Sequence, residues 1–153
     1  GIESTIISLI DEKKPLILRA GSLSVEKIES LIGKVYFRKS NKESSESPGL
    51  KKKHYSPKTP LRIIKNLSEL KNIETKNSAL LALDKIQNHQ GKDFKIVKIL
   101  PNDSDFRKAA SLLYSTLAEF DKAKLDAIFA ILPKKKDGLG IAIIDRLTRA
   151  SSR

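Results

Sequence analysis

Ten residues near the middle of the chain bring together side chains suited to binding a polyphosphate. The segment reads Pro48-Gly-Leu-Lys-Lys-Lys-His-Tyr-Ser-Pro57. Lysines supply point charges for phosphate, His and Tyr supply directional hydrogen bonds, and prolines restrict the empty loop. Lys51, His54 and Tyr55 are therefore candidate nucleotide ligands in a loop that closes over its ligand. The residues alone also allow a second interpretation, in which the segment is a solvated charged linker with an accidental His-Tyr pair.

The positive charge of the chain is concentrated around this segment. The net charge is +12 and the isoelectric point is about 9.9. Residues 34–65 hold ten Lys or Arg and two Glu, which is two thirds of the excess charge in about a fifth of the chain. This concentration favours a local anion site over a basic surface everywhere. Aromatic residues make up only 5% and Trp is absent, so a base-stacking platform is poorly supplied.

The composition also excludes several kinds of site. Without Cys there can be no disulfide and no thiol catalysis, and with two His residues we expect no metal site. No carboxylate pair has the spacing of a general acid and base. No apolar run approaches a membrane-spanning length, so we expect a cytoplasmic protein without membrane contact. Because Met is absent, we expect the chain to be part of a longer protein.

The sequence predicts strands and helices on both sides of this segment that could position such a site. Residues 2–10 predict a strand, and Leu16–Leu18 predicts a second one paired with it in a hairpin. A helix comes next, with Ser24 as its N-cap, Gly33 as its stop and an apolar face whose expected members are Val25, Ile28, Leu31 and Ile32. About 35 residues are too few for a stable core, so this part belongs to a larger domain or docks on the second half of the chain.

The second half predicts a layered α/β domain. Strands are expected at residues 61–64, 79–83, 94–100 and 125–132, with helices at 105–120 and 141–150 and a short one near 68–72. Strands that alternate with helices imply a mostly parallel sheet flanked by helices, Rossmann-like in outline. Residues 137–140 predict a turn that enters the last helix, because a third Gly at dinucleotide-binding spacing is missing. We therefore expect units at residues 1–35, a basic linker at 36–60 and a domain at 61–153.

Three segments together resemble one enzyme family. Gly1-Ile-Glu-Ser-Thr-Ile-Ile7 and Ile17-Leu-Arg-Ala-Gly21 resemble the end of a YrdC-like catalytic domain, which usually reads G-V-E-S-T-V-V and then I-L-R-P-G. Residues 48–57 resemble the linker P-G-M-K-Y-R-H-Y-A-P of the long, two-domain threonylcarbamoyl-AMP synthases. Residues 138–150 are similar to the ending G-L-G-x-A-I-x-D-R-L-x-R-A of the same enzymes. The order and spacing of the three segments match as well.

The resemblance implies a reaction and roles for residues that would otherwise be taken for surface groups. Members of the family make L-threonylcarbamoyladenylate from L-threonine, bicarbonate and ATP, with Mg²⁺ accompanying ATP, and serve threonylcarbamoyladenosine modification of tRNA. Ser4 and Arg19 would line the ATP site with Thr5 close by. Lys51, His54 and Tyr55 would belong to a lid over the nucleotide, and residues 61–153 would anchor it. Lys52, Lys53 and Ala20 depart from the usual Tyr, Arg and Pro, so the lid geometry can differ.

The resemblance also implies that a large part of the ATP pocket lies outside this chain. We therefore expect the chain alone to be inactive and the complete protein to be a nucleotidyltransferase, working with the threonylcarbamoyl-transfer machinery. Two other classes remain open. One is a basic tRNA-binding module without enzymatic activity, whose affinity would fall steeply with salt. The other is a docking module for partner proteins, and direct tRNA contact is compatible with the enzyme as well.

Overall fold

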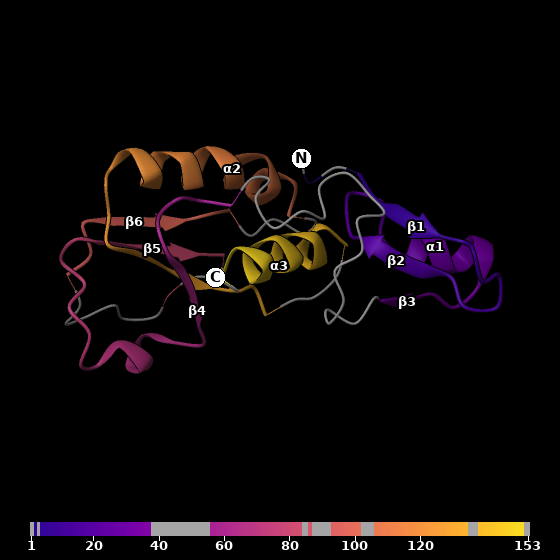
Figure 1. The fold of residues 1–153 in the computed structure, drawn as a ribbon, viewed down its shortest axis with the longest axis horizontal. Coiled ribbons are helices and arrows are strands. Elements are labelled where there is room, and N and C mark those ends of the chain that lie inside the picture. Colours follow the sequence, from indigo (N-terminus) through magenta and orange to yellow (C-terminus); the bar gives the residue numbers. More distant parts are fainter. Residues whose placement is uncertain are drawn as a thin grey trace.

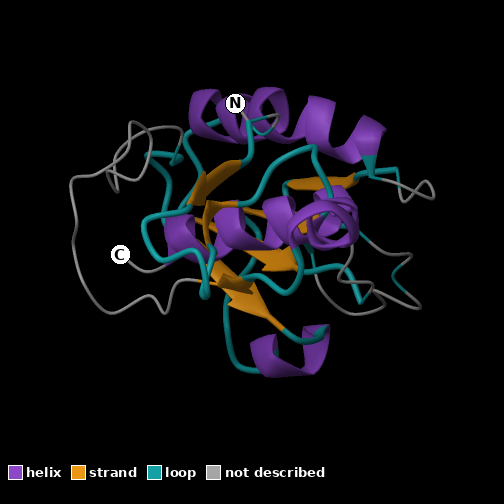
Figure 2. Ribbon diagram, turned by 90° about the vertical axis from the view of Figure 1, so that its right-hand side faces the viewer, coloured by secondary structure: helices purple, strands orange, loops and turns teal. Residues whose placement is uncertain are grey.

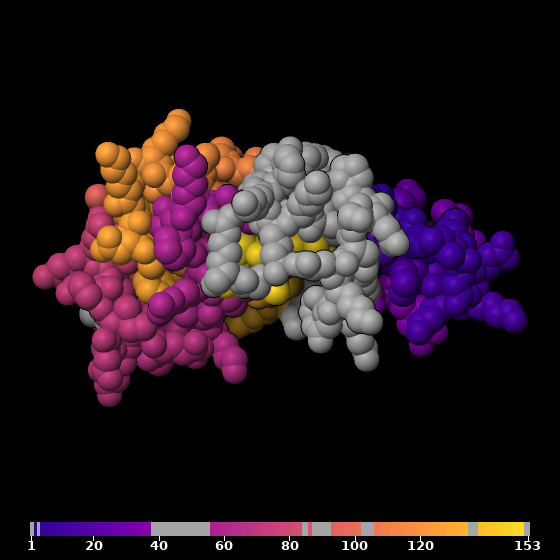
Figure 3. Space-filling model, in the orientation of Figure 1, coloured from indigo at the N-terminus to yellow at the C-terminus, as the bar shows by residue number. Residues whose placement is uncertain are grey.

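The chain forms two β-sheets that lie toward opposite ends of the molecule (Figure 1). The computed structural model describes residue 2 and residues 4–37, 56–83, 86, 93–101, 106–134 and 138–151. In the space-filling view the N-terminal residues form a lobe at one end, coloured indigo (Figure 3). Buried side chains of both parts, from Ile2 and Ile17 to Leu147, nevertheless belong to one hydrophobic cluster.

The first sheet is small and mixed. Strand β1 (Ile6–Ser8) pairs antiparallel with β2 (Leu16–Arg19), which confirms the predicted hairpin. The first strand is shorter than the predicted residues 2–10, and Leu9 and Ile10 lie exposed beyond its end. Strand β3 (Tyr36–Phe37) adds a parallel pair to β2. A two-residue strand has no periodic signal of its own, so the sequence did not predict it.

Helix α1 (Val25–Ile32) begins and ends where its capping residues predicted. The Ser24 side chain accepts a hydrogen bond from the Lys27 amide at 3.3 Å, and Gly33 ends the helix with a φ of 78°. The predicted apolar face is wrong in part. Only Ile28 of the helix is buried, whereas Leu31 is 77% exposed and Ile32 is 45% exposed.

The second sheet has four parallel strands, as the alternating pattern predicted. They are β4 (Leu61–Ile64), β5 (Ser78–Ala82), β6 (Ile96–Ile99) and β7 (Ala127–Ile131). Their order across the sheet is β4-β7-β5-β6. The last strand of the chain thus lies inside the sheet, between β4 and β5. The buried pattern of β5, with all five residues inside, is typical of such a covered parallel strand.

Helices and a short 3₁₀ element cover the two faces of this sheet. Helix α2 (Arg107–Lys122) and helix α3 (Gly138–Ser151) pack in one cluster with sheet residues such as Ala79, Leu81 and Ala130. The alternate sheet residues Leu80 and Phe129 pack with Leu70 of η1 (Leu67–Leu70) in a second cluster. In the end view the strands lie between the long helix at the top and η1 at the bottom (Figure 2).

The two long helices differ from prediction mainly at their starts. The predicted buried stripe of α2, comprising Phe106, Ala109, Leu113, Leu117 and Phe120, is confirmed. The predicted caps at residues 102–104 lie outside the described residues. Helix α3 begins at Gly138, so the turn predicted through Gly140 is wrong: these residues form the first helical turn. Gly138 has a φ of 47°, which glycine adopts without strain, and Gly140 is buried against the core.

Candidate functional site

The β1–β2 hairpin brings two of the predicted ligands to one face of the first sheet. Arg19 pairs with Ile6, and continuing the same antiparallel register places Ser4 opposite Gly21. Because side chains alternate along an extended strand, Ser4 and Arg19 lie on the same face. Ser4 is exposed, whereas Nε of Arg19 is shielded from solvent. A hydroxyl and a guanidinium on one face are suited to a phosphate or carboxylate oxygen.

Thr5 faces the other way and holds the two chain segments together. Its hydroxyl accepts a hydrogen bond from the Leu23 amide at 3.2 Å and donates one to the Leu23 carbonyl at 3.3 Å. Gly21 makes this close approach possible, since a Cβ there would lie 2.3 Å from the Ser4 carbonyl carbon. Thr5 thus positions Ser4, and the requirement for Gly21 is steric.

The central loop carries the other predicted ligands. Lys51, His54 and Tyr55 lie outside the described residues. Their expected closure over the nucleotide therefore stays a prediction. The chain is described again from Ser56, where it enters the second sheet.

A carboxylate that the sequence did not single out fixes this entry. Asp121, near the end of α2, accepts hydrogen bonds from the amides of Lys58 at 2.9 Å and Thr59 at 2.8 Å. Burial would raise the pKa of Asp121, but the hydrogen bonds from Thr59 and Lys58 outweigh it, so the pKa lies below its ordinary value. The link joins residues more than 60 positions apart, and no local pattern could have revealed it.

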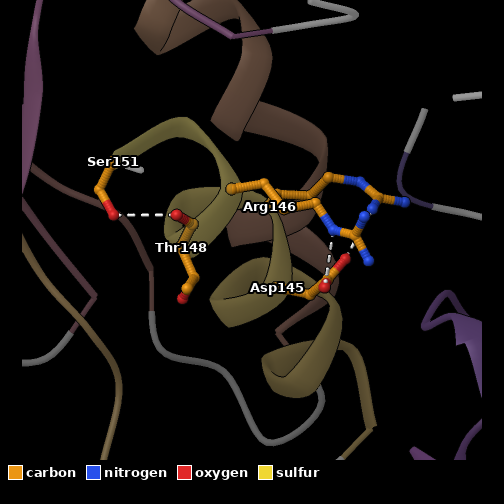
Figure 4. Close-up of polar contacts among 5 residues, drawn as sticks. Asp145, Arg146, Thr148 and Ser151 are labelled. Atoms are coloured by element: carbon orange, nitrogen blue, oxygen red, sulfur yellow. Dashed lines mark hydrogen bonds and ion pairs between the residues drawn. The ribbon is translucent and has the colours of Figure 1, made fainter. Parts of the chain in front are cut away.

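A second charged group lies on α3, within the segment similar to the family ending. The Asp145 carboxylate accepts a hydrogen bond from Nη1 of Arg146 at 2.8 Å and one from Nε of Arg149 at 2.9 Å. Figure 4 shows Asp145 and Arg146 side by side on the helix, with Thr148 and Ser151 bonded to each other along it. The sequence predicted contact between Asp145 and Arg149 from their spacing, but not the part played by Arg146.

The described residues hold neither a metal site nor a membrane segment. Among them there is no group of three His, Cys, Asp or Glu side chains that could hold a metal ion. Of the helices described, none is long and apolar enough to cross a membrane.

Comparison with known proteins gives a consistent result along the chain. Residues 23–152 match the family model described as "Threonylcarbamoyl-AMP synthase, C-terminal domain". Threonylcarbamoyl-AMP synthase of Bacillus subtilis (strain 168) is 32% identical, and the match covers 99% of this chain and 45% of that protein. The enzyme of the same name from Pyrococcus abyssi (strain GE5 / Orsay) is 29% identical over 99% of this chain and 46% of its own. The chain thus spans under half the length of these relatives.

Solved structures show the same fold. The crystal structure of P. abyssi Sua5 complexed with L-threonine matches with a TM-score of 0.77 and 26% identity, over 99% of this chain and 46% of that one. A P. abyssi Sua5 variant in which a His and the Tyr after it are replaced by Ala matches with a TM-score of 0.73 and 25% identity, over 99% and 45%.

Proposed function

Because the chain belongs to the threonylcarbamoyl-AMP synthase family as its C-terminal domain, we propose that it is the C-terminal part of an L-threonylcarbamoyladenylate synthase. The complete protein would convert L-threonine, bicarbonate and ATP into threonylcarbamoyl-AMP and pyrophosphate. The product would serve threonylcarbamoyladenosine modification of tRNA, in the cytoplasm and together with the threonylcarbamoyl-transfer machinery. The observation that carries this proposal is the match to enzymes of that name over 99% of the chain.

Residues 1–35 would be the last part of a YrdC-like catalytic domain, followed by the linker at 36–60 and the domain at 61–153. The surface of the N-terminal part supports this division. Leu31 is 77% exposed and Ile10 is 92% exposed, and the other exposed large apolar side chains of this part are Leu9, Leu23, Ile32 and Phe37. Such a density of exposed apolar groups in one small unit is expected where another domain packs.

The described residues can contribute to ATP binding without covalent chemistry. Ser4 and Arg19 would contact the nucleotide from the hairpin, and Thr5 would hold that hairpin in register. Lys51, His54 and Tyr55 would close over the phosphates, as an adjacent His and Tyr also occur in the P. abyssi relative. Displacement at the α-phosphate needs mainly positioning, charge neutralisation and exclusion of water.

Asp121 would support this lid from the second domain. Its carboxylate holds Lys58 and Thr59, directly after the lid sequence, against the end of α2. This attachment of one end of the loop restricts the positions that the loop samples, and so favours its closure. Mg²⁺ would arrive bound to the ATP phosphates, its usual mode in such sites.

Threonine- and bicarbonate-dependent release of pyrophosphate from ATP tests the proposal. The complete protein should release pyrophosphate only when both co-substrates are present, and the 153-residue chain should not. The variant with His54→Ala and Tyr55→Ala should lose activity, whereas the matched surface variant Lys65→Ala should keep it. Release that does not depend on threonine would refute the proposal.

The alternative of a basic tRNA-binding module is supported by the local charge of residues 34–65. The same protein preparations can distinguish it from the enzyme proposal. A folded complete protein that releases no pyrophosphate, but binds tRNA with affinity falling steeply as salt rises, would replace the enzyme proposal by this one.

A further inference from the structure

Arg146 is a largely buried cation that Asp145 satisfies only in part. Its side chain is 11% exposed, against 27% for Asp145 and 39% for Arg149. Nη2 of Arg146 is buried and lacks a hydrogen-bond partner in the part of the chain that the structure describes. An unpaired donor on a buried charged group costs more than an ordinary unmade hydrogen bond. The arrangement therefore requires an acceptor that is not among these residues.

The geometry of the guanidinium specifies what kind of acceptor fits. Asp145 occupies the Nη1 end of Arg146. The opposite edge, formed by Nε and Nη2, carries two parallel N–H groups, and this edge binds two oxygens of one phosphate or carboxylate. Among the described residues no acceptor lies at that edge. Asp145 therefore orients the guanidinium and leaves Nη2 without an acceptor among the described residues.

The nearest residues on the same stripe of α3 supply no acceptor for this edge. One turn before it is Ala142 and one turn after it is Ala150, both buried. Neither methyl group can accept a hydrogen bond. Figure 4 shows the side chain of Arg146 extending from the flank of the helix beside Asp145. With one carboxylate between two arginines, the group carries a net positive charge, which suits an anion.

We propose that Asp145, Arg146 and Arg149 form a phosphate-binding site on α3, in which the Nε and Nη2 edge of Arg146 holds two oxygens of a pyrophosphate or nucleotide phosphate. The choice of phosphate over carboxylate rests on the proposed function, whose substrate and product both carry phosphate groups. In that role α3 brings a phosphate contact from the second domain to the reaction, which couples that domain to the presence of the nucleotide.

Arginine Nε–H signals in ¹H–¹⁵N spectra of the 153-residue chain test this site directly. Pyrophosphate should move the Arg146 signal until it saturates, while acetate and chloride at equal ionic strength should leave it nearly unchanged. Arg146→Lys keeps the charge but loses the paired N–H groups, so binding should weaken at least tenfold. The matched control Arg62→Lys, at an exposed position of β4, should bind as the unaltered chain does.

Three results would overturn the site: an Arg146 signal that does not respond, equal saturation by acetate, or equal weakening in the Arg62 control. If Arg146→Lys does not fold, the response of the unaltered chain decides alone. Since this experiment measures binding without turnover, its failure would leave the synthase assay of the complete protein unaffected.

Discussion

Replacing Asp121 by asparagine should loosen the point at which the chain enters the second sheet. The carboxylate accepts two backbone hydrogen bonds, from Lys58 and from Thr59, and Thr59 is buried. Asparagine has one acceptor oxygen and an NH₂ group, so one of the two amides would face another donor. The variant therefore removes one charge-assisted hydrogen bond and creates an unfavourable contact with almost no change in shape.

The expected loss depends on the exposure of the group. A hydrogen bond to a charged group contributes roughly 1.5–3 kcal/mol when it is shielded. Because Asp121 is only partly buried, water can replace some of the lost interaction, and the lower end applies, about 1.5 kcal/mol. For a chain of this size such a loss lowers the unfolding midpoint by about 4 °C.

The pH dependence separates charge from shape. Since the pKa of Asp121 is lower in the folded protein, its contribution is complete above the ordinary carboxyl pKa and disappears as the pH falls through the folded value. Urea unfolding between pH 3 and pH 7 should therefore give a constant difference between the two proteins from pH 5 upward and a shrinking one below pH 4. Asp126→Asn, at an exposed site, should cost nothing at any pH. An Asp121→Asn variant as stable as the unaltered chain at pH 7, or a gap undiminished at pH 3, would show that the carboxylate charge does not hold this segment.

Three further changes probe the first sheet. Gly21→Ala places a methyl group 2.3 Å from the backbone carbonyl carbon of Ser4, so the hairpin should lose about 3 kcal/mol, seen as faster hydrogen exchange of the Leu23 amide, and unchanged exchange would contradict the steric argument. Ser24→Ala should cost α1 about 1 kcal/mol in exchange protection, while Ser30→Ala, inside the same helix, should cost none; equal effects would remove the cap from the explanation. Leu31→Lys should change the stability of the 153-residue chain by less than about 0.5 kcal/mol but destabilise the complete protein by about 2 kcal/mol, because only there would a second domain cover the site. Equal melting shifts in both forms would argue against that contact.

Short-range sequence patterns predicted the helices and strands well, because helix caps and apolar stripes depend on residues close together in the sequence. The cap at Ser24, the stop at Gly33 and the stripe of α2 from Ala109 to Phe120 depend on residues three or four positions apart. The alternation of strands and helices also fixed the parallel direction of the second sheet. The face of α1 was wrong because periodicity identifies an apolar stripe but not what covers it, and Leu31 has no cover here.

The sequence could predict the relative placement of candidate residues only where one hairpin sets it, and their roles stay predictions. Ser4 and Arg19 lie on one face because β1 and β2 are neighbours in sequence and in space. The contact of Asp121 with Thr59 joins two distant segments, and the lack of a partner for Nη2 of Arg146 among the described residues depends on which nitrogen Asp145 contacts. Residue types and spacing cannot reveal either contact, since both are decided by the packed arrangement of the helices.

The position of β7 inside the second sheet has a consequence for how the protein is made. Leu61 of β4 pairs with Ile128 of β7, a partner 67 residues later, and β5 also needs β7 as its neighbour. During synthesis on the ribosome, β4 and β5 therefore lack their shared neighbour β7 until nearly the whole domain has emerged. Closing such long loops before any contact forms slows folding and exposes strands to aggregation. A chain that stops before Ala127 would contain most of the sequence but not the strand that joins β4 to β5.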